Sequence, residues 1–168
     1  ASTDGTEEML KKRDIPFITQ ENLGSAGGWH RGIQHALDHD FDAVWLMDDD
    51  GFPDAGALKL LEAELLPDVA CSASVVVCED NPTHFVFPLP LLDKSGLPVI
   101  WGRLRKYVSL AELHVVSPDG TYPFAHFFNG SLVSMNSVRQ VGNVDINFFM
   151  SGDELDYLYR LRKVGKVI

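Results

Sequence analysis

The chain has 168 residues, and with 14 basic against 24 acidic side chains its formal net charge is −10. A surface of that charge repels the phosphate backbone, which excludes a general nucleic-acid-binding role and favours a small ligand. The hydrophobic fraction of 45% is ordinary for a single globular domain. No apolar run approaches the roughly 20 residues that a membrane-spanning helix needs.

The two cysteines, Cys71 and Cys78, lie in one apolar segment that we expect to be a strand. A straight strand holds them too far apart for a disulfide, so we predict reduced thiols and a cytoplasmic protein. Peripheral association with the inner face of a membrane and formation of a homo-oligomer stay open.

Helices and strands alternate over the first half of the chain, and this alternation builds a parallel sheet. In order, the patterns predict a helix ending near Arg13, a strand at 16–19, a helix after the glycine stretch 22–28, a strand at 43–47, a helix at 54–66 and a strand at 69–78. Asp4 with Glu7 has the spacing of a capping box for the first helix, and Asp54 is available as the N-cap of the third. An α/β domain normally opens on a buried strand, so we expect one or more strands ahead of Ala1.

The glycine stretch, residues 22–28 (NLGSAGG), leads into a helix with a periodic apolar face. Such a loop brings backbone N–H groups and the positive end of the helix dipole close to an anion. The candidate phosphate ligands are Asn22, Gly24, Gly27 and, one turn into the helix, Arg31. A tight strand-to-helix connection and a solvated arginine explain the same residues without a ligand.

An apolar run at residues 43–47 ends in three consecutive carboxylates, Asp48, Asp49 and Asp50. Burying an unpaired carboxylate is costly, so the acids must emerge at the carboxyl edge of the sheet, where open α/β sheets bind ligands. Adjacent like charges at that edge need water or a cation. A divalent metal that bridges carboxylates to substrate phosphates is the natural partner.

Residues 80–110 break the alternation with prolines at 82, 88, 90 and 98 and with several aromatic residues among them. An irregular stretch of that length predicts a functional lid or a binding loop. Within it, Trp101 is a candidate stacking platform for a sugar, or an ordinary loop anchor. Residues 112–116 and 121–127, separated by the turn sequence SPDG, predict a hairpin.

The last part of the chain carries a second pair of acids. We predict a strand at 128–135, a helical turn at 136–140 stopped by Gly142, an extended segment at 145–149, a helix at 153–164 and the start of a strand at 166. Asp153 and Glu154 open that helix, and simple capping explains them. The apolar residues and Gly152 just before them favour instead a loop that delivers a carboxylate into a pocket, where apolar walls raise its pKa toward that of a general base.

Taken in order, these motifs resemble glycosyltransferase family 2, the inverting GT-A enzymes, and within it the bacterial galactofuranosyl and rhamnosyl transferases. The resemblance is carried by residues 1–6, 22–28 with Arg31 and Gly32, 48–50, and 148–157 with Arg160. It implies an α/β GT-A fold with a Rossmann-like, mostly parallel sheet flanked by helices. It also implies that residues 1–168 are a single catalytic-domain fragment that lacks the family's first strand or strands and a C-terminal segment.

The resemblance implies roles for the first acid cluster and the glycine stretch on the donor side. Asp48 would face the nucleotide ribose or the metal, with Asp49 beside it, and Asp50 would ligate Mn²⁺ or Mg²⁺ on the donor diphosphate. The donor would be a UDP- or dTDP-linked sugar.

On the acceptor side, the resemblance implies that Glu154, or alternatively Asp153, deprotonates the acceptor hydroxyl. Trp101, Asn129 and Gly130 would border the acceptor, which would be a glycan or a lipid-linked glycan. The setting would be cell-wall or polysaccharide biosynthesis.

Two other functions fit parts of the pattern. A haloacid-dehalogenase-like phosphatase also carries a strand-end DxD followed by glycine, as in residues 48–51, and that function predicts a central position for the acidic strand in its sheet. A non-catalytic module for a nucleotide sugar or a glycan would keep the ligand site and lack turnover.

Overall fold

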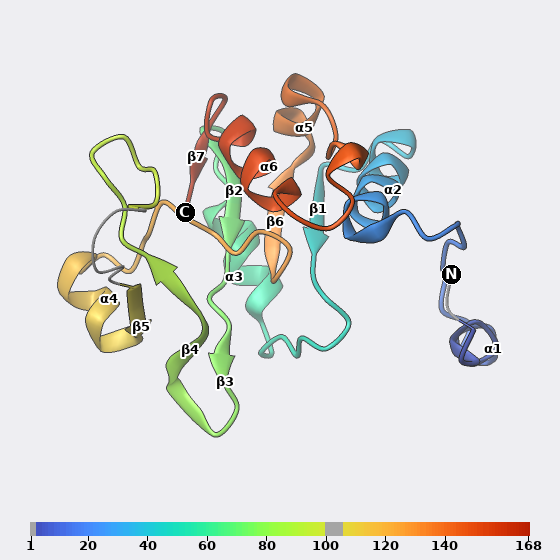
Figure 1. Ribbon diagram of the computed structural model, residues 1–168, viewed down its shortest axis with the longest axis horizontal. Coiled ribbons are helices and arrows are strands. Elements are labelled where there is room, and N and C mark those ends of the chain that lie inside the picture. Colours follow the sequence, from blue (N-terminus) through green and yellow to red (C-terminus); the bar gives the residue numbers. More distant parts are fainter. Residues whose placement is uncertain (1–2, 100–105) are drawn as a thin grey trace.

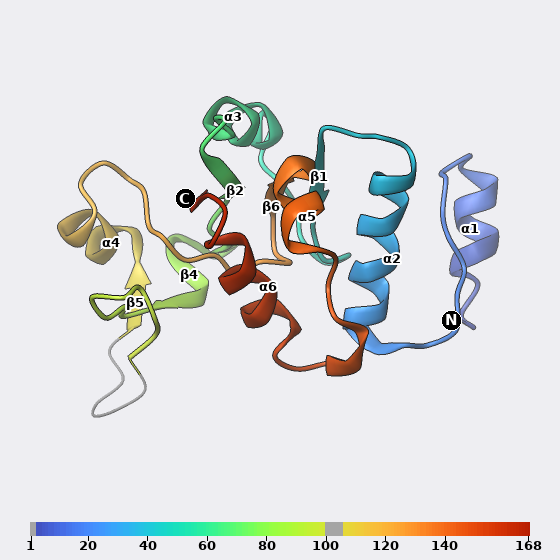
Figure 2. The same cartoon turned by 90° about the horizontal axis from the view of Figure 1, so that it is seen from above.

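A four-stranded sheet forms the centre of the molecule (Figure 1). The computed structural model describes residues 3–99 and 106–168. The strands lie in the order β1, β6, β2, β7, and their bounds are Ala43–Leu46, Ser131–Ser134, Val69–Ala73 and Lys166–Val167. Figure 2 shows helix α3 (Ala57–Glu64) on one side of this sheet and helix α6 (Asp153–Leu161) on the other. Helix α2 (Gly24–Asp38) packs against β1, and α5 (Met135–Val141) packs against α2 and α6.

The core lies between the sheet and these helices. Ile33 of α2, Val133 of β6 and Leu158 of α6 are fully buried within one apolar cluster. Each such side chain stabilises the fold by about 1.5–3 kcal/mol relative to an exposed one. The predicted periodic apolar face of α2 is therefore confirmed by the residues that this helix buries.

We predicted a mostly parallel sheet, and the strand directions in that prediction are wrong because the sheet is mixed. Strand β6 lies between β1 and β2 and runs antiparallel to both, and among the described residues only β2 with β7 is a parallel pair. The cause is the path of the chain. After β2 it passes through a second sheet beyond the carboxyl edge, so it enters β6 from that edge and runs back.

The second sheet occupies part of the segment that we predicted to be an irregular lid. Strands β3 (Val77–Cys78), β4 (Asn81–Pro90) and β5 (Lys106–Ser109) form it, with β4 in the middle. The prolines made this segment look irregular because the pairing of β4 with β5 is interrupted. The register shifts between His84 and Leu89, and Pro88 lies within that interruption. A proline is tolerated where no ladder hydrogen bond is needed. The predicted strand at 69–78 is correspondingly divided into β2 and β3.

The predicted hairpin at 112–127 is also wrong. Its first half is helix α4 (Leu110–Val116), and residues 121–127 form no strand. The Ser109 side chain accepts a hydrogen bond from the Glu112 N–H, and the Glu112 carboxylate accepts one from the Val108 N–H at 2.7 Å. These contacts satisfy the Glu112 N–H in the first turn and the Val108 N–H just before the N-cap, in a variant of the capping box.

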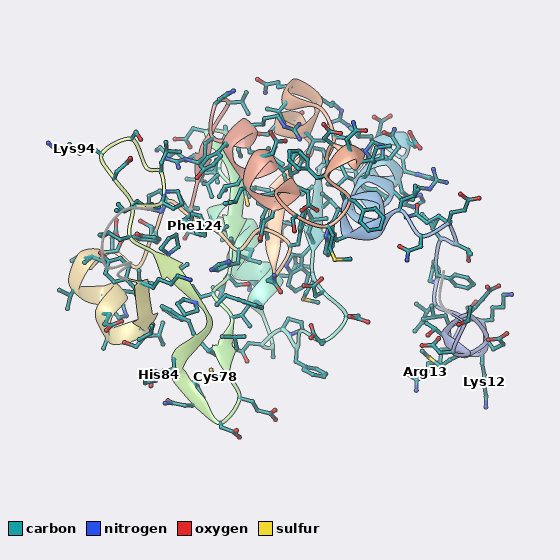
Figure 3. The ribbon with its side chains drawn as sticks, in the orientation of Figure 1. Lys12, Arg13, Cys78, His84, Lys94 and Phe124 are labelled. Atoms are coloured by element: carbon teal, nitrogen blue, oxygen red, sulfur yellow. The ribbon has the colours of Figure 1, made fainter. Side chains whose placement is uncertain are left out.

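Helix α1 (Thr6–Lys12) forms where we predicted it and buries none of its residues. Lys12 and Arg13 at its end point away from the rest of the molecule (Figure 3). The predicted capping box is wrong, because the Asp4 carboxylate accepts from Thr6 and Gly5 is the N-cap. The predicted strand at 16–19 is exposed and pairs with no strand of the described residues.

Three smaller boundaries differ from the sequence predictions. Helix α3 has Gly56 rather than Asp54 as its N-cap. The predicted extended segment at 145–149 contains a short 3₁₀ helix, η1 (Ile146–Phe148). Helix α6 ends at Leu161 rather than at Val164.

The predicted free thiols are confirmed, since neither Cys71 nor Cys78 forms a disulfide. Burial raises the pKa of Cys71 to about 12, so this thiol stays protonated and acts as a small core residue. Among residues 3–99 and 106–168, no helix has both the length and the apolar character required to cross a bilayer.

The cap of α4 gives a test of this part of the fold. Ser109→Ala should lower the free energy of unfolding by about 1 kcal/mol, because it removes a side-chain acceptor at the helix start. In a domain of this size that corresponds to about 2–4 °C in Tm, measured by calorimetry. Ser134→Ala is the matched control, because Ser134 precedes α5 in the same way but its side chain caps nothing. Equal losses in the two variants would contradict the assigned cap.

Candidate functional site

The first acid cluster emerges where β1 ends, at the edge predicted from the sequence. Leu46 is buried, Asp48 is half-buried, and Asp49 and Asp50 are exposed. Burial, followed by repulsion from Asp50 and Asp49, raises the pKa of the Asp48 carboxyl. The strand end therefore concentrates negative charge that water or a cation must stabilise.

The second acid pair begins α6, after Gly152, whose φ of 92° suits a residue without a side chain. The Asp153 side chain is buried, with an exposed fraction of 4%. The Ser25 hydroxyl donates to its Oδ2 at 3.3 Å. Asp153 thus faces α2, and its charge also lies at the positive end of the α6 dipole.

Glu154 faces the other way. Its Oε1 accepts a hydrogen bond from the Phe128 N–H at 3.4 Å. Burial raises the pKa of Glu154; N–H groups of Phe128 and Phe127 oppose that shift, and the charges of Asp153 and Asp48 add to it. Because the charge of Asp48 acts on Glu154, these two acids, far apart in the sequence, lie near each other in the fold.

Asn129 and Gly130 lie just before β6, and Gly130 lies beside the ends of β1 and β2. The Gly130 N–H donates to the Leu46 carbonyl at 2.9 Å, and the Ser74 hydroxyl donates to the Gly130 carbonyl at 3.1 Å. Gly130 has a φ of 104°, and a Cβ there would lie 2.4 Å from the Ser74 Oγ. Only glycine fits this position. Trp101, the predicted stacking platform, lies outside the described residues.

The glycine stretch uses several of its backbone donors inside the protein. The Gly24 N–H donates to the Asn22 Oδ1 at 3.0 Å, the Ala26 N–H to the Phe149 carbonyl at 3.1 Å, and the Gly27 N–H to the Leu23 carbonyl at 3.3 Å. These groups are therefore not free to cradle a phosphate as the helix stands. Arg31 is exposed on α2, so its predicted contact with an anion stays a prediction.

The acids can take part in a metal site only together with another ligand. Within residues 3–99 and 106–168, no three His, Cys, Asp or Glu side chains come together to hold an ion. One or two carboxylates at the end of β1 suit Mg²⁺ or Mn²⁺ sites in which a diphosphate and water complete the coordination. The half-buried Asp48 and its charged neighbours fit such an arrangement.

The two best-formed hollows among the described residues contain none of the acids of this site. A cavity of about 50 Å³ between the two sheets is lined by Ser74, Phe87 and His126, among others. It is far below the 300–1,000 Å³ typical of ligand pockets. A hollow of about 700 Å³ lies beside β7 and contains none of the predicted site residues. The candidate site is therefore located by its acidic residues and not by a surface hollow.

Sequence reasoning missed two polar residues of the site. Ser25 was part of the glycine stretch, but nothing in the sequence connects it to Asp153, which lies 128 positions away. Ser74 carried no motif at all, and its contact with Gly130 follows from the pairing of β2 with β6.

Comparison with known proteins agrees with the ordered motifs. Residues 1–128 match the profile of glycosyl transferase family 2. The chain is 35% identical over 163 residues to the galactofuranosyltransferase GlfT1 of Mycolicibacterium smegmatis, covering 94% of this chain and 52% of the relative. It is 35% identical over 150 residues to GlfT1 of Mycobacterium tuberculosis, covering 88% of this chain and 46% of the relative.

The chain thus spans about half the length of the curated relatives that it matches. The family profile covers most of this chain, including the glycine stretch and the first acid cluster. The α/β architecture agrees with the fold implied by that family, although its sheet is mixed. On these grounds the chain belongs to glycosyl transferase family 2.

Proposed function

We propose that this chain forms the catalytic part of an inverting glycosyltransferase that depends on a divalent metal. The donor is a nucleotide diphosphate sugar, and the acceptor is a glycan or a lipid-linked glycan. The observation that carries this proposal is the half-buried Glu154, whose pKa is raised by burial and by the neighbouring acids, including Asp48 of the other cluster. Such a pair can divide base chemistry and donor binding between two carboxylates.

On the donor side, Asp48 would contact the ribose or the metal, and Asp50 would ligate Mn²⁺ or Mg²⁺. Asp50 suits this role because it is exposed at the strand end and can reach a ligand in solvent. A bound ion would supply positive charge to the departing diphosphate. Asp49 lies between the two and stays a candidate for contact with the nucleotide.

On the acceptor side, Glu154 is the general base. A carboxylate with a raised pKa binds the hydroxyl proton more strongly than an ordinary one. The acceptor oxygen then forms the new bond to the anomeric carbon, and the bond from that carbon to the diphosphate oxygen breaks on the opposite face, which inverts the configuration. Asp153 remains the alternative base, but its burial against Ser25 makes it less accessible to an acceptor.

The names of the relatives suggest the sugar. Because both GlfT1 proteins are called galactofuranosyltransferases, we propose a nucleotide-linked galactofuranose as donor, with UDP or dTDP as the carrier. Asn129, Gly130 and Trp101 are the proposed acceptor border. Cell-wall polysaccharide synthesis is the corresponding process.

The two alternatives predict different observations. A phosphatase would have its acidic strand in the centre of the sheet, whereas β1 is at the edge of the sheet formed by the described residues. A non-catalytic binding module would have no need of a half-buried carboxylate with a raised pKa. It would bind a nucleotide sugar without consuming it, and an assay of donor turnover separates it from an enzyme.

The metal assignment predicts that Asp50→Asn weakens binding of UDP in the presence of Mn²⁺. A metal site loses roughly 10–100-fold in affinity when even a supporting contact is removed, so at least that loss is expected for a direct ligand. Isothermal titration calorimetry on the full-length protein measures it. Asp54→Asn, an exposed carboxylate just beyond the motif, is the control and should bind normally. Unchanged affinity in Asp50→Asn would remove Asp50 from the site.

The base assignment predicts that Glu154→Gln keeps UDP affinity and lowers the rate of transfer from UDP-galactofuranose by about 10²–10⁴-fold. The amide keeps the shape and the contact with the Phe128 N–H but cannot take a proton. Initial rates with saturating donor measure the loss. Glu62→Gln, on the exposed face of α3, should retain the normal rate. Normal transfer by Glu154→Gln would move the role to Asp153 or to another residue.

The raised pKa of Glu154 also predicts an effect on stability. The folded protein keeps the Glu154 proton to a higher pH than the unfolded chain, in which Glu154 has its ordinary pKa of 4.5. The free energy of unfolding therefore falls as the pH rises from 4.5 through the pKa of the folded state. Above that pKa the loss of stability is complete. Glu154→Gln removes this loss. Its Tm should exceed that of the unmodified protein at neutral pH, and the difference should shrink below pH 4.5. A pH-independent difference would contradict this assignment.

A further inference from the structure

We infer that the first two turns of α2 position the general base, with Ser25 as the polar contact and Gly24 as the steric requirement. This inference rests on the proposed function, because it concerns how Glu154 is held. It gives the glycine stretch a task other than phosphate binding. The contacts run from α2 to the loop before α6, to Asp153, and to the segment before β6.

The loop before α6 contains a strained turn that α2 holds in place. Phe149 has φ 58° and ψ −66°, and the Met150 N–H donates to the Phe148 carbonyl at 2.7 Å. This is the γ-turn with positive φ, which is rare and strained for a residue with a side chain. Such a conformation persists only where the surroundings enforce it.

Helix α2 holds the Phe149 turn in this conformation. The Phe149 carbonyl accepts from the Ala26 N–H at 3.1 Å and lies 3.4 Å from the Ser25 hydroxyl. A Cβ on Gly24 would lie 2.1 Å from the same carbonyl oxygen, and Gly24 has a φ of 72°. The loop can therefore approach α2 this closely only because residue 24 is glycine.

The second contact reaches the acid pair directly. Asp153 is buried, and a buried carboxylate without a polar partner is strongly unfavourable. Within the described residues, the side-chain hydrogen-bond partner of Asp153 is the Ser25 hydroxyl, 3.3 Å from the Asp153 Oδ2. Since Asp153 and Glu154 are consecutive in the first turn of α6, holding one orients the other.

A third contact approaches Glu154 from the opposite side. The Trp29 and Phe128 rings stack with centroids 4.4 Å apart and an interplanar angle of 10°. The Phe128 N–H is the donor to the Glu154 carboxylate. Trp29 therefore fixes the segment that holds the base. Through Ser25 and Trp29, one helix controls both sides of Glu154, and each is a positioning residue rather than a catalytic one.

The test compares Ser25→Ala, Ser25→Thr and Gly32→Ala in the full-length protein. Residue 32 lies in the same helix, and a Cβ there meets nothing within 4 Å, so Gly32→Ala is the matched control. Transfer from UDP-galactofuranose gives kcat, KM for the donor and the pH profile of kcat. Amide hydrogen exchange over residues 146–154 reports the loop without requiring activity.

We expect Ser25→Ala to lower kcat by about tenfold with KM for the donor nearly unchanged, the loss expected for one hydrogen bond of about 1.4 kcal/mol. It should also shift the acidic limb of the pH profile and speed exchange over 146–154. Ser25→Thr, which keeps the hydroxyl, should restore all three. Gly32→Ala should match the unmodified protein.

Unchanged exchange and kcat in Ser25→Ala would overturn the inference. A rise in KM with kcat unchanged would also overturn it and would favour the phosphate-binding role of the glycine stretch. If the unmodified protein transfers no sugar, the proposed function fails, whereas exchange over 146–154 still decides whether α2 holds the loop. Gly24→Ala gives a second measure and should speed exchange in that loop more than Ser25→Ala does.

Discussion

The structure depends on holding like charges from two distant segments at one sheet edge. Burial, followed by repulsion from Asp50 and Asp49, raises the pKa of Asp48. Burial also raises the pKa of Glu154, and the charges of Asp153 and Asp48 add to that shift. Such a cluster disfavours folding unless other groups stabilise it. The positive end of the α6 dipole and the Phe128 N–H partly stabilise the second pair. The charges of Asp49 and Asp50 remain exposed to solvent, as expected of a binding site rather than of a stabilising core.

The mixed sheet is what allows this cluster to form. Because β6 enters from the carboxyl edge of β1 and β2, the residues just before it, 127–130, lie beside the acids at the end of β1. A parallel β6 would place those residues at the opposite edge. Gly130 then joins the two neighbouring strands, through the carbonyl of Leu46 and the hydroxyl of Ser74. The excursion through the second sheet thus brings the N–H of Phe128 to Glu154.

The sequence predicted those features that depend on local pattern. The apolar face of α2 was recognisable because burial selects residues at fixed spacing, and the strand before Asp48 was recognisable as a short apolar run. The prolines of β4 misled because its ladder has a gap at Pro88, and the reversal of β6 was not visible because strand direction depends on a long connection. At the site, the sequence predicted both acid clusters but not Ser25 or Ser74, whose contacts exist only after distant segments pack together.

The different surroundings of Asp153 and Glu154 follow from helix geometry. Successive residues of an α-helix are rotated by about 100°, so neighbouring side chains at its start point toward different elements. In α6 the first acid points to Ser25 on α2 and the second toward Phe128 and Asp48. The buried acid anchors the turn and the half-buried one remains open to a substrate. Two adjacent carboxylates that look equivalent in the sequence thereby acquire separate surroundings. Helix α2 links them, because it contacts Asp153 directly and Glu154, the proposed base, through Phe128.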